Sequence, residues 1–338
     1  MTEIDTNMQF DVYTPDTDIS DVTEFYVNII IAALEMVGFN CSRIDDLRKK
    51  SENKNKGILV IDATKSIKAR RYGYKYILYW VQGIMPEESF MRNSSKLRSY
   101  VLSIIERTAL NSADFHFFVS EQMRQHYLDK YGFDSDKYYI MPCFNDDIDN
   151  IDRDSTKFRE NIFLYAGRIG TWAHFDETAK LYKKIEENNK NTRFLILTSD
   201  RDKAEKVMAK YNIKNYEIDF VQQEHLKDRI KHCKFGFCLR EKNEVNYVAT
   251  PTKFSTYVSN GIIPIYSSIT KSFADYARDN KYCICVDEED HLERILGLCN
   301  ESIPENKIAE SFIETFGRYY SAEYHKKEIS KILENIIR

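Results

Sequence analysis

The sequence predicts an α/β protein made of two Rossmann-like halves, each with a parallel sheet. Strand-like apolar runs alternate with helix-like amphipathic segments along most of the chain, which is typical of βαβ units. An acidic stretch poor in apolar residues, at 145–155, interrupts this alternation, which then starts again. The length of 338 residues suits two domains of ordinary size better than one.

The first half begins with a short, partly alternating segment and continues with apolar runs bounded by polar residues, as expected for buried parallel strands. Gly132 marks the end of the helix before it. The predicted strands are 8–13, 57–61, 74–81, 115–119 and 138–141, and the predicted helices are 18–36, 94–111 and 121–131.

The second half repeats the pattern, with strands at 162–166, 193–198, 216–221, 235–239, 262–266 and 283–286. Helices are predicted at 176–188, 203–211, 225–233 and 271–279, and another begins at Pro251. The tail, 307–338, is a long amphipathic helical pattern with a weak point at Gly317. We therefore expect domains at 1–150 and 151–310, followed by a C-terminal helix at 311–338.

Composition excludes several classes of protein. A net charge of −4 gives no support to a nucleic-acid-binding surface. The seven cysteines are odd in number and contain no C-x-x-C, which favours a reduced cytoplasmic protein over a zinc site or a disulfide framework. The acidic, polar start is no secretory signal, and the longest apolar stretch, 27–39, is too short to span a bilayer. We expect a soluble or peripheral protein.

The most informative segment is 246–265, which predicts a polar loop, a helix and a buried strand. Thr250 suits the N-cap, Pro251 suits the first helical position, and Gly261 suits the C-terminal stop. Lys253 adds a positive charge in the first helical turn. Free N–H groups and a cation at a helix start predict a site for a pyrophosphate.

The same segment carries the pattern Asn-x-x-Ala-x-Pro-Thr-Lys-Phe, followed by Tyr and by Gly-x-x-Pro, which resembles the donor-binding motif of family 4 retaining glycosyltransferases of the GT-B fold. Other segments resemble the family in the same order, more closely in the second half than in the first. They are Trp80 to Gly83, Ala113-Asp114 with Val119-Ser120, Tyr165 to Arg168 with Trp172, and Phe235 to Arg240.

This resemblance implies two domains facing a central cleft, with a final helix that returns to the N-terminal domain. The N-terminal domain would bind the acceptor and the C-terminal domain a nucleotide-diphosphate sugar. The implied reaction transfers the sugar, with retention of configuration, to a saccharide or lipid-linked saccharide acceptor in the synthesis of cell-surface polysaccharides. It requires no cofactor beyond the donor and no metal, if cationic side chains stabilise the leaving group.

Candidate donor residues follow the carboxyl ends of the predicted strands, where open α/β sheets bind their ligands. Lys253 and Arg168 are the candidate catalytic residues, which would hold the leaving diphosphate. Arg240 either binds phosphate or sugar, or pairs with a carboxylate. Thr198 either contacts the donor or caps the next helix. The candidate donor-binding residues are Gly167, Thr198, Val221, Arg240, Asn246, Pro251, Thr252 and Thr256.

The chain departs from the resembled pattern at one point. Many family members have two glutamates with seven residues between them, and the second holds the ribose; here the positions are Val248 and Thr256. This departure raises an alternative from another class of protein: a catalytically inactive partner that keeps the fold and binds nucleotide sugar. A nucleotide-sugar epimerase on the same fold is a weaker third reading, because the expected catalytic carboxylates and histidines are missing.

On the acceptor side, Gln82 and Glu121 are candidate residues, since each lies just past a predicted strand, and Asp16 is either a third candidate or a plain loop carboxylate. His116 sits inside an apolar run and is predicted to be a core residue. The basic and aromatic segment 68–76 either rests on an anionic membrane as a peripheral contact or is an exposed helix end.

Overall fold

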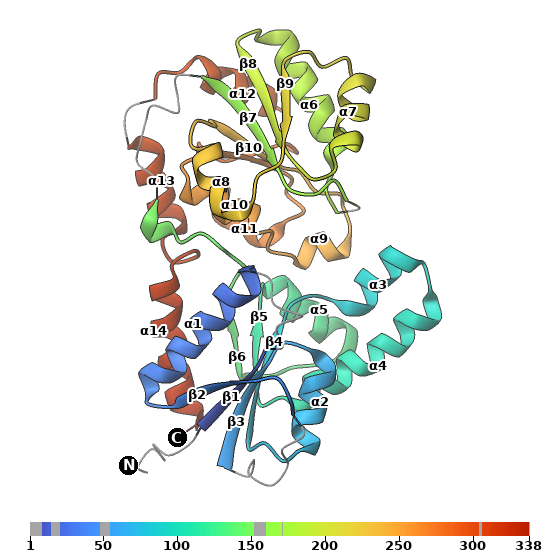
Figure 1. Cartoon of the computed structure of the whole chain (residues 1–338), viewed down its shortest axis with the longest axis vertical. Helices are drawn as coiled ribbons and strands as arrows, with labels where there is room; N and C mark the ends of the chain where they lie inside the picture. The colour runs from blue at the N-terminus through green and yellow to red at the C-terminus, as the bar shows by residue number, and fades with distance from the viewer. Residues whose placement is uncertain are drawn as a thin grey trace. The chain divides into compact units, whose positions relative to one another are not determined.

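The computed structural model describes residues 9–14, 21–47, 55–151, 160–170, 172–303 and 306–337. The chain divides into two compact units. Unit 1 comprises Met1–Asn145, Val248–Thr250 and Ser321–Arg338, and unit 2 comprises Asp146–Tyr247 and Pro251–Tyr320. Each unit has one six-stranded parallel sheet with helices around it, which confirms the predicted α/β class (Figure 1).

The sheet of unit 1 has the order β2-β1-β3-β4-β5-β6, and every pair is parallel. Its strands are β1 (Gln9–Tyr13), β2 (Asn40–Ile44), β3 (Lys56–Val60), β4 (Tyr76–Val81), β5 (Phe115–Phe118) and β6 (Tyr138–Ile140). Its helices are α1 (Asp21–Val37), α2 (Ala63–Arg71), α3 (Met85–Asn93), α4 (Lys96–Ser112), α5 (Glu121–Tyr131) and α14 (Ala322–Ile337). Helix α14 packs along α1, so helices from the first and the last parts of the described chain lie in one unit.

The predicted helix 121–131 is confirmed to the residue, and its ends show why. The hydroxyl of Ser120 accepts a hydrogen bond from the Met123 N–H at 3.1 Å, as an N-cap should. At the other end Gly132 adopts φ +64°, a left-handed conformation that glycine reaches without strain. Local chemistry alone specifies both ends of this helix.

The sheet of unit 2 has the order β12-β11-β10-β7-β8-β9, again parallel throughout. Its strands are β7 (Asn161–Ala166), β8 (Thr192–Leu197), β9 (Tyr216–Asp219), β10 (Phe235–Cys238), β11 (Ile263–Tyr266) and β12 (Ile284–Cys285). Its helices include α6 (Phe175–Asn188), α7 (Arg201–Lys210), α8 (Gln223–Ile230), α10 (Lys253–Ser259), α11 (Lys271–Ala277), α12 (His291–Asn300) and α13 (Lys307–Phe316). The 3₁₀ turn η2 (Ile148–Asn150) also lies in unit 2, as does the short helix α9 (Glu244–Val248) up to Tyr247.

Strands β7 and β10 are neighbours in the middle of this sheet. Phe163 of β7 stacks against Phe235 of β10, with ring centroids 4.5 Å apart, and both side chains are buried. Gly236 of β10 lets helix α10 approach closely, because a Cβ there would lie 2.7 Å from the ring of Tyr257. The loops that follow β7 and β10 therefore emerge side by side at one edge of the sheet, next to α10.

The predicted break in the tail is confirmed, because α13 ends at Phe316 and Gly317 is its C-cap. Other elements differ from the prediction. Helices α2, α3, α9 and α12 and strand β2 were not predicted. Helix α2 is mostly polar, and its N-cap is Asp62, which accepts hydrogen bonds from two backbone N–H groups. No helix in the described ranges combines the length and apolar character needed to cross a bilayer.

Candidate functional site

The loop after β7 forms one side of the candidate site in unit 2. Gly167 has φ +124°, which side chains of L-residues rarely allow, so the glycine predicted here is required by the backbone. Its N–H donates to the Leu197 carbonyl at 2.8 Å, and the next turn is held by the Ile169 N–H, which donates to the Asp200 carboxylate at 2.9 Å. The loop is thus fixed to the end of the neighbouring strand β8.

The side chain of Lys253 reaches this loop from α10. Its Cε and Nζ lie 3.0 and 3.3 Å from the position that a Cβ on residue 167 would occupy. The ammonium also lies 4.0 Å from the centroid of the Tyr165 ring, a distance typical of a cation–π contact. A glycine at 167 therefore makes room for the lysine, and the Tyr165 ring stabilises its ammonium through the cation–π contact.

The environment of Lys253 disfavours its charge. Burial lowers the pKa of the ammonium to about 8, and the nearby Arg240 acts in the same direction. No carboxylate in the described part of the chain forms an ion pair with Lys253. The ammonium is still mostly protonated at neutral pH, so the structure holds an uncompensated positive charge against the Gly167 loop.

Arg168 follows Gly167 and its side chain is exposed. Its backbone carbonyl accepts a hydrogen bond from the Tyr165 hydroxyl at 2.9 Å, which holds the loop over the same ring that Lys253 contacts. Hydrogen bonds from Lys203 and from the Ile169 N–H lower the pKa of Asp200, and the charge of Arg168 adds to this effect. The two predicted catalytic residues, Arg168 and Lys253, thus belong to one loop-and-helix cluster.

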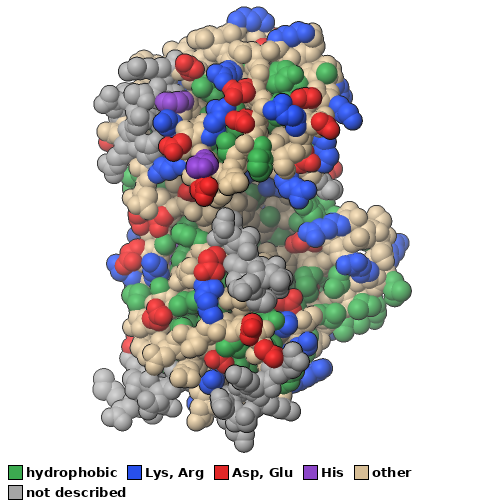
Figure 2. Space-filling view, viewed as in Figure 1, with side chains coloured by type: hydrophobic (Ala, Val, Ile, Leu, Met, Phe, Trp, Pro, Cys, Tyr) green, Lys and Arg blue, Asp and Glu red, His purple; other side chains and the backbone are tan. Residues whose placement is uncertain are grey.

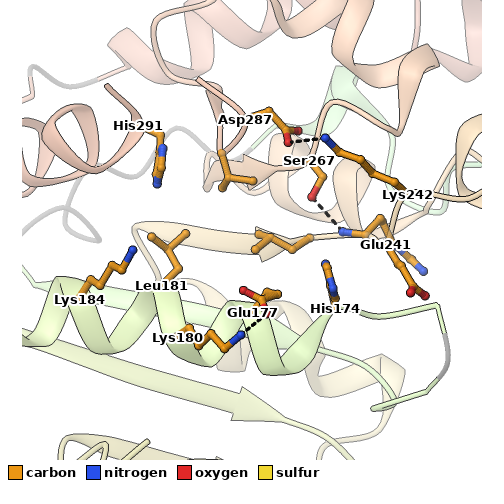
Figure 3. Close-up of a pocket in the computed structure, with 13 residues that line it drawn as sticks. His174, Glu177, Lys180, Leu181, Lys184, Glu241, Lys242, Ser267, Asp287 and His291 are labelled. Atoms are coloured by element: carbon orange, nitrogen blue, oxygen red, sulfur yellow. Dashed lines mark hydrogen bonds and ion pairs between the residues drawn. The ribbon is translucent and has the colours of Figure 1, made fainter. Parts of the chain in front are cut away.

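Arg240 follows β10 and borders a pocket of about 570 Å³ on the side of the sheet covered by α6 and α12. Its N–H donates to the Ser267 hydroxyl at 3.1 Å, and its side chain forms no ion pair with any described carboxylate. Figure 3 shows His174 and Glu177 on the α6 side of this pocket and Ser267 and Asp287 on the other side, with Glu177 paired to Lys180 of its own helix. Of the two readings of Arg240, the described residues favour a guanidinium available to a ligand.

The other predicted donor residues differ in what they can reach. Thr198 is buried and its hydroxyl accepts from the Asp200 N–H at 3.1 Å, which stabilises the turn into α7. Asn246 is also buried, and its amide donates to the Glu241 carbonyl at 2.9 Å. Val221 is partly exposed in the loop after β9, next to Phe220, a clearly exposed aromatic side chain. The structure brings Gly167, Arg240 and Lys253 together, and leaves Val221 on a separate strand end.

The predicted start of α10 is wrong by two residues. The helix begins at Lys253 with Thr252 at the N-cap position, and Thr252 makes no side-chain capping bond. Thr250 does not cap it, because its hydroxyl accepts a hydrogen bond from the Cys143 N–H at 2.9 Å within unit 1. Pro251 precedes the helix, and its carbonyl accepts from the Phe254 N–H. With only seven residues in α10, the site depends on the Lys253 side chain rather than on a helix terminus.

Thr256 lies one turn after Lys253, and its hydroxyl donates to the carboxylate of Asp146 at 2.7 Å. The backbone carbonyl of Asp146 accepts a second bond, from the Ser259 hydroxyl at 3.1 Å. A carboxylate is therefore present beside position 256, although the sequence has no glutamate there. Sequence reasoning missed Asp146 because it precedes α10 by more than a hundred residues.

On the acceptor side, unit 1 places Gln82 after β4 and Glu121 at the start of α5, both exposed. Glu121 pairs with Arg124 at 2.6 Å. Asp16 lies outside the described residues. A further carboxylate, Glu88, was not predicted: it lies where a Cβ on Gly83 would be, and burial raises its pKa.

His116 is confirmed as a core residue. It is 2 % exposed, its Nε2 lies 2.9 Å from the Leu110 carbonyl, and burial lowers its pKa. Within the described ranges, no group of three or more His, Cys, Asp and Glu side chains is arranged to hold a metal ion.

No protein-family model matches the sequence, and neither does any curated protein sequence. Solved structures do match. The lipopolysaccharide outer core galactosyltransferase WaaB, in its apo form, is 12 % identical over 97 % of this chain and 99 % of its own, with a TM-score of 0.66. An α-glucosyltransferase solved with UDP and a 13-mer DNA containing an HMU base is 14 % identical over 96 % of this chain and 99 % of its own, with a TM-score of 0.64.

A mutant of S. aureus TarM, in complex with fondaparinux, α-GlcNAc-glycerol and UDP, is 14 % identical with a TM-score of 0.62. That match covers 92 % of this chain, which spans only 59 % of the TarM chain. Identities this low establish the fold and leave the activity open. From the two six-stranded parallel sheets with their surrounding helices, and from these matches, we conclude that the chain has the GT-B fold of glycosyltransferases.

Proposed function

We propose that this protein transfers a sugar from a nucleoside-diphosphate sugar to a hydroxyl of a saccharide or lipid-linked saccharide, with retention of configuration. The observation that supports it most is the Lys253 ammonium held against Gly167 at the carboxyl end of β7. Arg240 follows the neighbouring strand, and Arg168 follows Gly167. Three cationic side chains around a glycine loop suit a diphosphate leaving group.

The proposed chemistry depends on charge that develops as the donor breaks. When the bond between the anomeric carbon and the phosphate oxygen is cleaved, the diphosphate gains negative charge. Lys253, Arg168 and Arg240 stabilise that charge, which lowers the barrier more than it tightens ground-state binding. The acceptor oxygen forms the new bond to the anomeric carbon from the same face, and its proton passes to the departing phosphate. The cationic side chains supply the neutralising charge.

The remaining donor contacts follow from the same edge of the sheet. We place the nucleobase near Val221, where the exposed ring of Phe220 offers a stacking surface. We assign the ribose hydroxyls to the Asp146 carboxylate, which Thr256 orients through its hydrogen bond. Asn246 and Thr198 act indirectly in this proposal, by holding the loops that end at Glu241 and Asp200. Pro251 and Thr252 set the start of α10, from which Lys253 extends.

The acceptor is assigned to unit 1, at the carboxyl ends of β4 and β5. Gln82 and Glu121 are exposed there and offer an amide and a carboxylate to sugar hydroxyls. Glu88 adds a carboxylate with a raised pKa beside Gly83. Polar side chains of this kind fix the orientation of a saccharide while its rings pack on neighbouring surfaces.

The test is turnover of a panel of UDP-, GDP- and CDP-sugars, measured as release of the nucleoside diphosphate with pooled saccharide and lipid-linked acceptors. UDP-sugars come first, because both the TarM mutant and the α-glucosyltransferase were solved with UDP. The wild type should turn over at least one donor. Lys253→Ala should lose about a hundredfold or more, as expected when a group that stabilises the leaving charge is removed.

Lys206→Ala is the matched control, because Lys206 is an exposed lysine on α7 of the same unit. It should keep the wild-type rate. Nucleotide binding without turnover of any donor would favour the inactive partner instead. A Lys253→Ala variant as active as the wild type would refute the proposed site.

A further inference from the structure

Helix α4 carries an apolar stripe that the described residues of unit 1 leave exposed. Leu97, Tyr100, Val101 and Ile104 are between 48 % and 75 % exposed. Of the eleven exposed large hydrophobic residues in the described part of the chain, these four and Phe90 of α3 fall within fifteen consecutive residues. Figure 2 shows hydrophobic and basic side chains gathered on α3 and α4, which extend beyond the rest of unit 1 in Figure 1. Exposure concentrated in this way indicates a binding surface.

The spacing of the stripe matches one face of a helix. With 3.6 residues per turn, Tyr100, Val101 and Ile104 all point within about 60° of the direction of Leu97. The opposite face holds Glu106, which is buried and accepts hydrogen bonds from the Met85 N–H and the Tyr131 hydroxyl. The inner face of α4 is therefore anchored to unit 1 by α2 and α3, and the outer face is apolar.

Charge flanks the stripe on both sides. Viewed along the helix axis, Lys96 and Arg107 are rotated by about 80–100° from Leu97 in one direction, and Arg98 by about 100° in the other. All three are exposed, and none pairs with a carboxylate in the described ranges. The only acidic residue of α4 is the buried Glu106. The exposed surface of this helix thus combines apolar side chains with three positive charges and no negative one.

We propose that α4 docks on an anionic lipid bilayer, with its apolar stripe in the interface and Lys96, Arg98 and Arg107 at the level of the head groups. An apolar face bordered on both sides by cations is the pattern of helices that lie in the membrane surface. A second copy of this chain fits less well, because the same face would bring three positive charges against three others. The inference does not depend on the donor site.

The basic segment 68–76 is a poorer candidate for this contact. Arg70 is paired with Asp114 at 2.7 Å, and Tyr74 is buried with its hydroxyl bonded to Asp11 at 2.8 Å. An aromatic ring held inside the unit cannot enter an interface. The membrane contact that the sequence suggested there is better placed on α4.

The experiment is flotation of the full chain with vesicles of phosphatidylcholine, with and without phosphatidylglycerol. We expect the protein to float with the anionic vesicles. With neutral vesicles it should remain at the bottom of the gradient. The double variant Leu97→Gln, Ile104→Gln should weaken partitioning about tenfold or more, since two apolar side chains no longer enter the interface. The triple variant Lys96→Gln, Arg98→Gln, Arg107→Gln should weaken it similarly and abolish its dependence on salt.

Met36→Gln is the control, because Met36 is an exposed hydrophobic residue on α1 of the same unit and lies outside the α4 stripe. It should bind anionic vesicles as the wild type does. All variants should keep the wild-type melting temperature and UDP affinity, which separates this test from that of the donor site. Absence of binding to anionic vesicles, or a double variant that binds as the wild type does, would overturn the proposal. So would a lipid-free dimer in sedimentation velocity that the double variant converts to monomer, since a second copy would then cover the stripe.

Discussion

The ammonium of Lys253 lies 4.0 Å from the centre of the Tyr165 ring, although 88 residues separate the two in sequence. The contact places a partly buried cation at the carboxyl end of β7, against a glycine whose backbone conformation excludes other residues. Because burial disfavours the charge, the apo protein holds Lys253 at a cost in stability that a bound anion would remove.

Replacing Lys253 by methionine should stabilise the protein and weaken nucleotide binding at once. Methionine keeps most of the side-chain volume and removes the desolvated charge, so the free energy of unfolding at neutral pH should rise by about 1–2 kcal/mol. In a unit of this size each kcal/mol corresponds to about 2–4 °C in Tm. Thermal unfolding and calorimetric titration with UDP measure the two effects. Lys206→Met, the surface control, should change neither, and a destabilised Lys253→Met would contradict this account of the lysine.

Adding one methyl group at position 167 should displace the lysine. Gly167→Ala forces an L-residue to φ +124° and places Cβ 3.0 Å from the Lys253 Cε. We expect a loss of about 1–2 kcal/mol in stability and at least a tenfold loss in UDP affinity. Gly170→Ala is a close control, because a Cβ there meets no atom within 4 Å. Equal UDP affinities for the two alanine variants would show that the loop after β7 does not contact the nucleotide.

Nucleotide affinity should fall as the pH rises through the pKa of Lys253, about 8. Between pH 7 and pH 9 the free ammonium loses its proton, whereas a bound diphosphate favours the charged form, so binding takes up a proton in this window. A diphosphate carries its full negative charge by pH 8, so its own titration does not oppose the trend. Calorimetry in buffers of different ionisation enthalpy measures this uptake. It should vanish in Lys253→Met, and uptake that persists in that variant would assign the proton to another group.

The carboxylate beside Thr256 should distinguish ribose from deoxyribose. In our proposal Asp146 accepts hydrogen bonds from the ribose hydroxyls, so the wild type should bind UDP more tightly than 2′-deoxy-UDP. Asp146→Asn should reduce that preference. Thr256→Val should remove the hydrogen bond at 2.7 Å and cost about 1–2 kcal/mol of stability. An unchanged preference in Asp146→Asn would exclude Asp146 from the ribose site while leaving the diphosphate site intact.

Much of the fold could be predicted because its determinants are local. Apolar runs specify the buried strands β3, β4 and β5, and Ser120 and Gly132 specify both ends of α5. Helix α2 was missed because it is short and mostly polar, with few apolar residues to mark a buried face. The start of α10 was placed too early because the hydroxyl of Thr250 binds a backbone N–H from another part of the chain. No local pattern reveals that choice.

The candidate site, like the fold, was predictable where local sequence decides and unpredictable where packing decides. The rule that ligands lie at the carboxyl ends of parallel strands indicated Gly167 and Arg240, and the helix pattern indicated Lys253. The structure places Gly167 and Arg240 after adjacent strands, with Lys253 against Gly167. It could not indicate that Asn246 and Thr198 are buried, because burial depends on packing by distant segments. Asp146 and Tyr165 were missed for the same reason, since each meets α10 only in the folded unit. Position along a strand was predictable, and the partner of each side chain was not.

A crystal structure of the complex with UDP would show directly whether Lys253 binds the diphosphate. We predict that the diphosphate lies against the Gly167–Arg168 loop, with a phosphate oxygen within hydrogen-bonding distance of the Lys253 ammonium. Density for UDP elsewhere on the protein, with the Lys253 side chain still resting on Tyr165 and contacting no phosphate, would contradict this prediction.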